Sequence, residues 1–137
     1  MAILMTVLFI LLGTLHIYWA VGGKRGIDKA LPVVDEAPAI APGLWLTLFV
    51  ALALFICGFV IFKLGVSQST TLFLEGDLVY LGWFLSAIFT LRAIGDFHLV
   101  GFFKKIKTSL FSKYDTFIYS PLCVMLGIGF GLASLNL

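Results

Sequence analysis

Three ionisable side chains lie close together where a long apolar run ends. The run from Leu78 to Ile94 contains Arg92 near its end and is followed by Asp96 and His98. Arg92 and Asp96 are four residues apart, so on a helix they share one face and can form an ion pair. Charges at the edge of a membrane-embedded helix are costly unless they are paired, hydrated or functional. This stretch is therefore the first candidate for chemistry.

Two further polar groups occur in other apolar runs. His16 lies near the end of the first run, at helical spacing from Trp19, and Tyr119 lies near the start of the last run. An imidazole beside a carboxylate keeps its proton and holds its ring in one orientation. If the helices bring His16 and Asp96 to the same depth, the two side chains form a candidate acid–base pair.

Four apolar runs must position these groups. The chain is 61% hydrophobic and 12% charged, with a mean hydropathy of +1.13, whereas a soluble domain carries about a quarter charged residues. About 20 apolar residues are enough for a helix to cross a bilayer. We therefore predict an all-α fold, a four-transmembrane-helix bundle, in which residues 1–137 form a single integral membrane domain. The predicted spans are about 1–21, 43–63, 72–96 and 116–135.

The first apolar run is expected to be a retained span. No basic residue precedes it, and Lys24 and Arg25 follow it instead. A signal peptide has its basic stretch in front of the apolar part. The sequence therefore favours a first transmembrane helix over a cleaved leader.

Small residues predict where the helices approach each other closely. Gly82 and Ser86 form one patch at four-residue spacing, and Gly127 and Gly131 form another. Such patches let helix backbones come close in a membrane, and we expect them to pack within the bundle. The short polar turn at 65–71 predicts that the second and third spans are antiparallel neighbours.

The fourth span contains a proline near its start. We expect this helix to begin near Thr116 and to have a kink or broken turn at Pro121, because proline cannot donate the helical hydrogen bond. Tyr119 and Ser120 are candidates to satisfy the freed backbone groups.

The segment before this span has its own pattern. Apolar residues recur every three or four positions from Phe97 to Leu110, with lysines mostly between them. This pattern predicts an amphipathic helix that lies on anionic headgroups between the third and fourth spans.

The basic residues predict the orientation of the chain. Eight of the nine Lys and Arg residues follow the first or third span or end the third, and only Lys63 lies on the other side. Cytoplasmic loops are enriched in Lys and Arg. We therefore expect a multi-pass protein of the inner (plasma) membrane with both termini outside the cytoplasm, and a polar cluster near the cytoplasmic face.

Three motifs together resemble a known family. They are His16 to Gly23, Arg92 to Phe97 with Gly101 to Lys104, and Asp115 with Tyr119 to Cys123. The chain is similar over nearly its whole length to a family of small four-helix bacterial integral membrane proteins that is known as a domain of unknown function. The resemblance implies the fold and the location, and it implies no activity.

The polar residues favour a binding site as the working hypothesis. A recess at the cytoplasmic helix ends would bind a small amphipathic molecule or a lipid headgroup. Trp19, Phe97 and Tyr119 would form its walls, and Arg92 or Lys24 would meet an anion. The predicted ligand-binding residues are His16, Trp19, Arg92, Asp96, His98 and Tyr119.

Several alternatives stay open at the sequence level. His16 and Asp96 are the candidate catalytic residues of a membrane enzyme, although no nucleophile motif or phosphate-binding loop is present. His16 and His98 could flank a haem or metal, but no local ligand spacing supports such a site. A purely structural polar clasp is the fourth reading. A transporter would usually need a dimer, and no charge lies at the expected midplane.

The expected partners follow from the same composition. Membrane lipids and a small amphipathic ligand are predicted, and an oligomer stays open. A formal net charge of only +2 gives no reason to expect nucleic acid. No cofactor is identified by the sequence.

Overall fold

The protein is an all-α bundle of four long helices, as the apolar runs predict. The computed structural model describes residues 1–25, 33–34, 37–38, 43–66, 72–95 and 115–135. In these ranges the long helices are α1 (Ala2–Ala20), α3 (Leu44–Gly65), α4 (Leu72–Ile94) and α6 (Ser120–Leu135), with α6 preceded by the short helix η1 (Asp115–Tyr119). Four segments, Ala2–Ala20, Leu44–Gly65, Gly76–Ile94 and Thr116–Leu135, are long and apolar enough to cross a membrane. The predicted four-span fold is confirmed.

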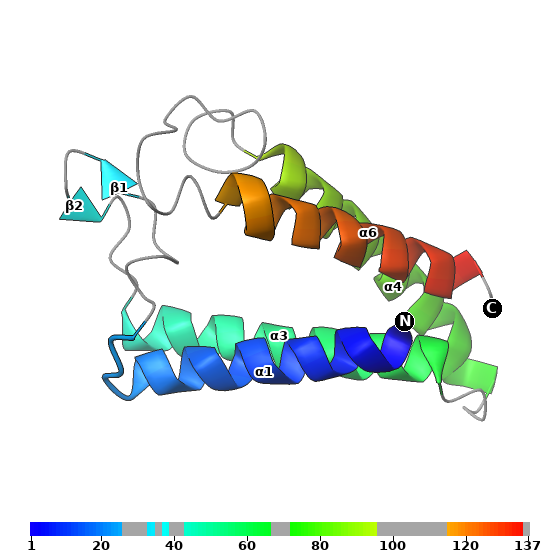
Figure 1. Ribbon diagram of the computed structural model, residues 1–137. Helices are drawn as coiled ribbons and strands as arrows, with labels where there is room; N and C mark the ends of the chain where they lie inside the picture. The colour runs from blue at the N-terminus through cyan, green and yellow to red at the C-terminus, as the bar shows by residue number, and fades with distance from the viewer. Residues whose placement is uncertain (26–32, 35–36, 39–42, 67–71, 96–114, 136–137) are drawn as a thin grey trace.

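The helices are arranged as two antiparallel hairpins. Helix α1 packs chiefly against α3, and α4 packs chiefly against α6. The hairpins meet near the two ends of the chain and diverge toward the opposite end (Figure 1). The expectation that the second and third spans are neighbours therefore holds only in part. Helices α3 and α4 touch, but each buries most of its contact surface against its own hairpin partner.

Aromatic side chains fill the region where the hairpins meet. Phe9 of α1 lies between Phe89 of α4 and Phe130 of α6, with ring centroids 5.7 and 5.9 Å away. The rings of Phe89 and Phe130 stack at 5.8 Å. Phe9 and Phe130 have no exposed surface. Rings at these separations add attraction beyond their buried area, so this cluster joins the hairpins.

Helices α4 and α6 pack through the predicted small residues. Ser86 Oγ donates a hydrogen bond to Gly127 O at 2.7 Å. A Cβ atom on Gly127 would lie 2.8 Å from Thr90 Oγ1 and 3.2 Å from Ser86 O, and one on Gly131 would lie 3.3 Å from Ser86 Oγ. Only glycine permits this separation between the backbones. The prediction that these patches pack within the bundle is confirmed.

The hairpin of α1 and α3 uses a similar device. A Cβ atom on Gly58 would lie 3.1 Å from Phe9 Cβ. Thr6 Oγ1 donates to Ala2 O within its own helix at 2.9 Å and lies 3.5 Å from Gly58 O. Close approach here brings the side of α1 that carries Phe9 against α3.

Two glycines end the helices that carry the candidate site residues. Gly22 follows α1 with φ +104°, and Gly95 follows α4 with φ +83°. The Gly95 amide donates to Leu91 O at 2.8 Å, and the Gly22 amide donates to Trp19 O at 3.1 Å. Residues other than glycine rarely adopt this left-handed backbone conformation. Glycine is therefore common at the position just after the C-terminus of a helix. The two helices therefore end just beyond the polar residues.

The proline of the fourth span explains the irregular start of that helix. Pro121 follows η1, a π-helical turn, and regular α-helix begins at Ser120. A proline ring would collide with the carbonyl of the residue four positions earlier in a regular helix, and the wider π-turn removes that geometry. The structure confirms the expected start near Thr116 and the broken turn at Pro121.

The loops contribute little described structure. Strands β1 (Val33–Val34) and β2 (Ala37–Pro38) form a two-residue antiparallel ladder in the first loop, with Val33 opposite Pro38 and Val34 opposite Ala37. The predicted amphipathic helix from Phe97 to Leu110 lies outside the described residues.

Candidate functional site

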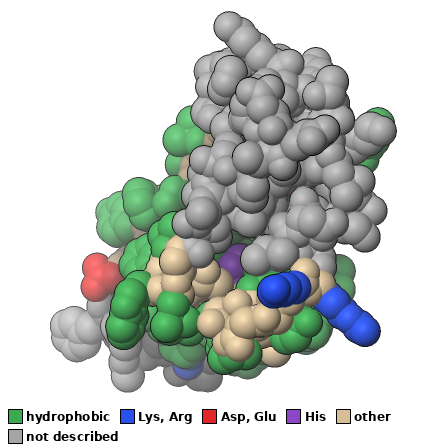
Figure 2. Space-filling view, turned by 90° about the vertical axis from the view of Figure 1, so that its left-hand side faces the viewer, with side chains coloured by type: hydrophobic (Ala, Val, Ile, Leu, Met, Phe, Trp, Pro, Cys, Tyr) green, Lys and Arg blue, Asp and Glu red, His purple; other side chains and the backbone are tan. Residues whose placement is uncertain are grey.

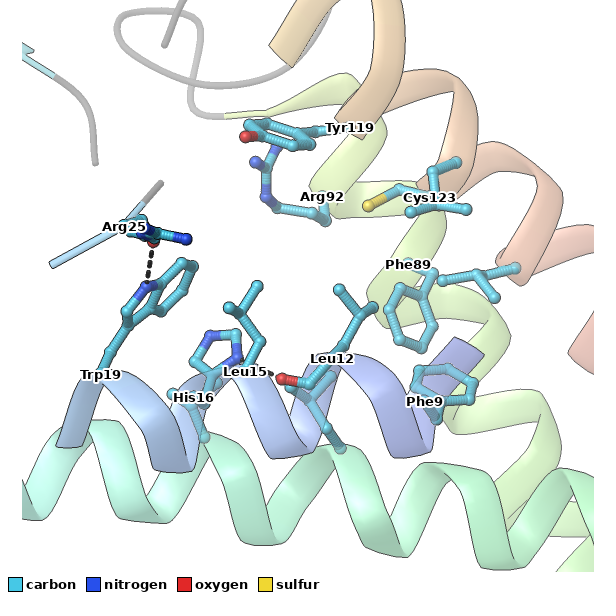
Figure 3. Close-up of a pocket in the computed structure, with 14 residues that line it drawn as sticks. Phe9, Leu12, Leu15, His16, Trp19, Arg25, Phe89, Arg92, Tyr119 and Cys123 are labelled. Carbon is cyan, nitrogen blue, oxygen red and sulfur yellow. Dashed lines mark hydrogen bonds between the residues drawn. The ribbon is translucent and has the colours of Figure 1, made fainter. Parts of the chain in front are cut away.

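The divergence of the hairpins leaves a cavity between them. Its volume is about 520 Å³, and residues from α1, α3, α4, η1 and α6 line it. The lining residues are Phe9, Leu12, Leu15, His16, Trp19, Arg25, Val50, Leu54, Phe89, Arg92, Tyr119, Leu122, Cys123 and Leu126. Figure 3 shows the polar members on one side and the phenylalanines on the other. Figure 2 looks onto the end of the molecule where a histidine and basic side chains are visible.

His16 is held by its own helix with one ring nitrogen still available. Nδ1 lies 2.8 Å from Leu12 O, and because a carbonyl only accepts, Nδ1 carries the proton in this bond. The other nitrogen, Nε2, points away from α1 toward the cavity (Figure 3). The ring is half-buried. His16 therefore presents an acceptor when neutral and a donor when protonated.

Trp19 connects the helix end to the chain that follows it. Its ring meets the His16 ring edge-on, with centroids 5.0 Å apart and planes at 65°. Its Nε1 donates to Arg25 O at 2.9 Å. This bond turns the chain after Gly22 back over the helix end and keeps Arg25 beside the cavity (Figure 3). The indole thus supports both His16 and a cation.

Arg92 and Tyr119 form the opposite wall. Arg92 lies in the last turn of α4 and is half-buried, with its Nη1 atom shielded from solvent. Its guanidinium lies beside the ring of Tyr119, which comes from the π-helical turn η1 (Figure 3). Because α4 ends at Ile94, just before Gly95, Arg92 is within one turn of the helix end. The guanidinium therefore lies at the same end of the cavity as His16 and Trp19, across from them (Figure 3).

The inner part of the cavity is apolar. Phe9, Leu12, Phe89 and Leu126 line it, and the fully buried aromatic cluster of Phe9 and Phe130 closes it. Cys123 also lines the cavity, with its sulfur directed toward Arg92 (Figure 3). The cavity thus has a cationic, hydrogen-bonding mouth and an apolar interior.

The structure brings together four of the six predicted ligand-binding residues. His16, Trp19, Arg92 and Tyr119 all line this cavity. The other two, Asp96 and His98, lie outside the described residues. The proposed partnership of His16 with Asp96, the pairing of His16 with His98, and the Arg92–Asp96 ion pair therefore stay predictions. Lys24, which the sequence offered as an anion contact, is exposed and is not among the lining residues.

The sequence missed several lining residues. Arg25 reaches the cavity because its carbonyl accepts a hydrogen bond from Trp19 Nε1. No rule of residue spacing predicts that hydrogen bond. Phe9 lies about three helical turns before the end of α1, and Phe89 lies between one and two turns before the end of α4. Only the angle between the hairpins brings both rings to the floor of the cavity. Cys123 also lines the cavity and was not among the predicted ligand-binding residues. Cys123 lies four residues after Tyr119, and this helical spacing is the sequence signal that both residues share one face of the helix.

The described side chains also bear on the metal and haem interpretation. No group of three or more His, Cys, Asp or Glu residues that could hold a metal ion occurs within the described part of the chain. His16 is the histidine that the structure describes, and its neighbours in the cavity are apolar, aromatic or cationic. The haem and metal interpretation thus depends on residues outside the described ranges.

Comparisons with known proteins give a family and nothing more specific. A family model with the description "Protein of unknown function (DUF3995)" matches residues 9–130. The comparison with curated proteins found no match, and the comparison with solved structures also found none. The match covers α1 from Phe9 onward and all of the cavity-lining residues.

Proposed function

The chain belongs to the DUF3995 family of proteins of unknown function, and from the chemistry of its cavity we propose that it binds a small amphipathic molecule or a lipid headgroup. The observation that carries the proposal is one cavity with two kinds of lining. Cationic and aromatic groups (Arg25, Arg92, Trp19) surround one end, and leucine and phenylalanine side chains line the other. A ligand pocket is expected to be mostly apolar with a few convergent polar groups.

The size of the cavity supports this proposal. Ligand pockets typically measure about 300–1,000 Å³, and the volume here is about 520 Å³. Voids larger than a water molecule are uncommon in packed protein interiors. A space of this size between two hairpins is therefore more consistent with an occupant than with a packing defect.

The local bonding of His16 weighs against a purely structural clasp. A clasp needs His16 to bond to a neighbouring helix, whereas its Nδ1 bonds to Leu12 O within α1. That bond stabilises the ring orientation without connecting two helices. The bond also directs Nε2 into the cavity. A side chain held in this way is suited to contact a ligand.

The orientation in the membrane completes the proposal. Both termini lie at one end of the bundle, while α1 and α4 end at the other (Figure 1). The cavity mouth lies at this second end, where Lys24, Arg25 and Arg92 also lie. By the positive-inside rule, the mouth faces the cytoplasm of a bacterial cell and both termini face outward.

The experiment is to fill the cavity and look for loss of the occupant. Leu54 lines the cavity, so Leu54→Trp places an indole inside it. Leu52, on the same helix, is 58% exposed on the outer face, so Leu52→Trp is the matched control. Native mass spectrometry of protein purified from membranes should show an adduct of defined mass on wild type and on Leu52→Trp, and a loss of most of it on Leu54→Trp. Equal adducts on all three proteins would reject the cavity as the binding site.

A further inference from the structure

The charge around the cavity mouth selects the class of ligand. Arg25 and Arg92 line it, and no Asp or Glu occurs among the described residues that do so. Lys24 adds a third positive charge to the same helix end. A guanidinium pairs with carboxylate and phosphate oxygens better than with neutral groups. The described mouth therefore favours a negatively charged headgroup.

The depth of the cavity selects the rest of the ligand. Trp19 lies at the mouth and Phe9 at the floor, ten residues apart on α1. At 1.5 Å per residue this distance is about 15 Å, which is half of the ~30 Å hydrocarbon core of a bilayer. One leaflet's acyl chain spans that half. The apolar part of the cavity thus matches an acyl chain in length as well as in polarity.

From these two observations we propose that the ligand is a long-chain anionic amphiphile, with a carboxylate or phosphate headgroup on one acyl chain. This inference rests on the proposed function and names the ligand class for the same site. Arg92 and Arg25 hold the headgroup, and His16 Nε2 completes the contact. The chain runs along α1 past Leu12 and ends against the ring of Phe9.

The position of His16 explains why an acid suits this mouth. Because Nδ1 is committed to Leu12 O, Nε2 can accept a hydrogen bond from a protonated acid. When the imidazole is protonated, Nε2 instead donates to the anion. An acid headgroup can therefore bond to Nε2 through one shared proton, carried either by the acid or by the imidazole. An alkylamine would meet repulsion from both arginines.

Cys123 provides a direct readout of occupancy. Its thiol lines the cavity, whereas Cys57 is 7% exposed and packs in the core cluster. The full-length protein in nanodiscs of phosphatidylcholine is treated with a maleimide, and labelling at each thiol is located by peptide mass mapping. Palmitate, palmitoyl lysophosphatidate, hexadecanol and hexadecylamine are the probes.

We expect palmitate or palmitoyl lysophosphatidate to slow the labelling of Cys123 at concentrations about tenfold lower than hexadecanol requires, which corresponds to ~1.4 kcal/mol. Hexadecylamine should protect least, and the labelling of Cys57 should not respond. The comparison of palmitate with palmitoyl lysophosphatidate identifies which headgroup is preferred.

Two variants test the role of the charges. Arg92→Gln should remove the preference for acids over hexadecanol. Arg92 is half-buried, and its replacement can also disturb folding. Arg25→Gln, in the exposed segment that follows α1, is therefore the second variant and should reduce the preference severalfold. Lys63→Gln removes a charge at the opposite end of the bundle and should leave the preference unchanged.

The outcomes separate the two proposals. Equal protection by acids, hexadecanol and hexadecylamine overturns the inference and leaves the proposed function intact. Protection by no probe, with Cys123 labelled freely, overturns both. Unchanged acid preference in Arg25→Gln and in folded Arg92→Gln also overturns the inference, because the arginines would then not be the headgroup contacts.

Discussion

At the scale of single residues, the cavity is set up by short-range bonds on one helix. His16 bonds to Leu12 O one turn earlier, and its ring rests on Trp19 one turn later. Trp19 in turn bonds to Arg25 O. Each of these contacts spans six residues or fewer, so α1 and its C-terminal extension orient three polar groups before any other helix is present.

A pair of substitutions on α1 separates binding from stability. His16→Ala and Thr14→Ala each remove a side-chain bond to a carbonyl four residues earlier, at 2.8 Å in both cases. Each loss should cost about 0.5–1.5 kcal/mol, so the two melting temperatures in detergent should fall by similar, small amounts. Only His16→Ala should lose the co-purified adduct, because Thr14 is exposed on the outer face.

The result for these two variants also distinguishes the structural clasp. A clasp requires His16→Ala to melt several degrees below Thr14→Ala, with no difference in the bound adduct. That pattern would contradict the binding site and support the alternative.

At the scale of the elements, small residues set how closely helices pair, and large ones set where they separate. Gly127, Gly131 and Ser86 bring α4 and α6 together along their length. In a bilayer, lipid tails are as apolar as leucine, so close packing and hydrogen bonds between helices drive association. The two hairpins, which lack such a patch at the cavity end, are joined instead by the aromatic cluster around Phe9.

Gly127→Ala tests the α4–α6 interface. The new methyl would lie 2.8 Å from Thr90 Oγ1, and Thr90 cannot rotate away without loss of its own 2.8 Å bond to Ser86 O. The added carbon should cost about 1–3 kcal/mol, measured as a lower melting temperature in detergent.

Gly76→Ala is the matched control for this substitution. Gly76 lies in α4, is exposed, and has nothing within 4 Å of an added Cβ atom. The change should be neutral or stabilising by up to about 1 kcal/mol, because alanine favours the helix over glycine. Equal losses in the two variants would mean that helix propensity rather than the interface is being measured.

At the scale of the whole molecule, the outer surface and the cavity face different surroundings. Large apolar side chains cover the outside of all four long helices, among them Leu4, Phe49, Phe84 and Ile128, each at least 56% exposed. Such a surface is expected for helices that face lipid. The polar side chains at the cavity mouth are instead shared between the two hairpins, at the end where the hairpins are furthest apart (Figure 1).

The orientation of the chain gives the prediction at this scale. Alkaline phosphatase fused after Leu137 should be active in a bacterial host if, as we propose from the positive-inside rule, the termini lie outside the cytoplasm. The same enzyme fused within the lysine-rich stretch at Lys104 should be inactive, and this fusion is the control. Activity at Lys104 with none at the C-terminus would invert the topology and place the cavity mouth outside.

Part of the candidate site was predictable because depth in a membrane follows from position along a span. His16, Trp19, Arg92 and Tyr119 each lie within about one turn of a helix end, so their common level could be counted from the sequence. Arg25, Phe9 and Phe89 could not be found this way. Arg25 depends on a turn made after the helix, and the two phenylalanines depend on which helices face each other.

The sequence by itself determined the four spans, their ends and the arrangement of charge, because each of these depends on runs of neighbouring residues and on the cost of placing polar groups in lipid. It also indicated the small-residue patches that α4 and α6 use. The tertiary structure alone decided that α1 pairs with α3, that the hairpins diverge, and that a cavity opens between them. Long helices that are apolar on every side carry no period that selects a partner, so their pairing follows from the fit of particular side chains across the bundle.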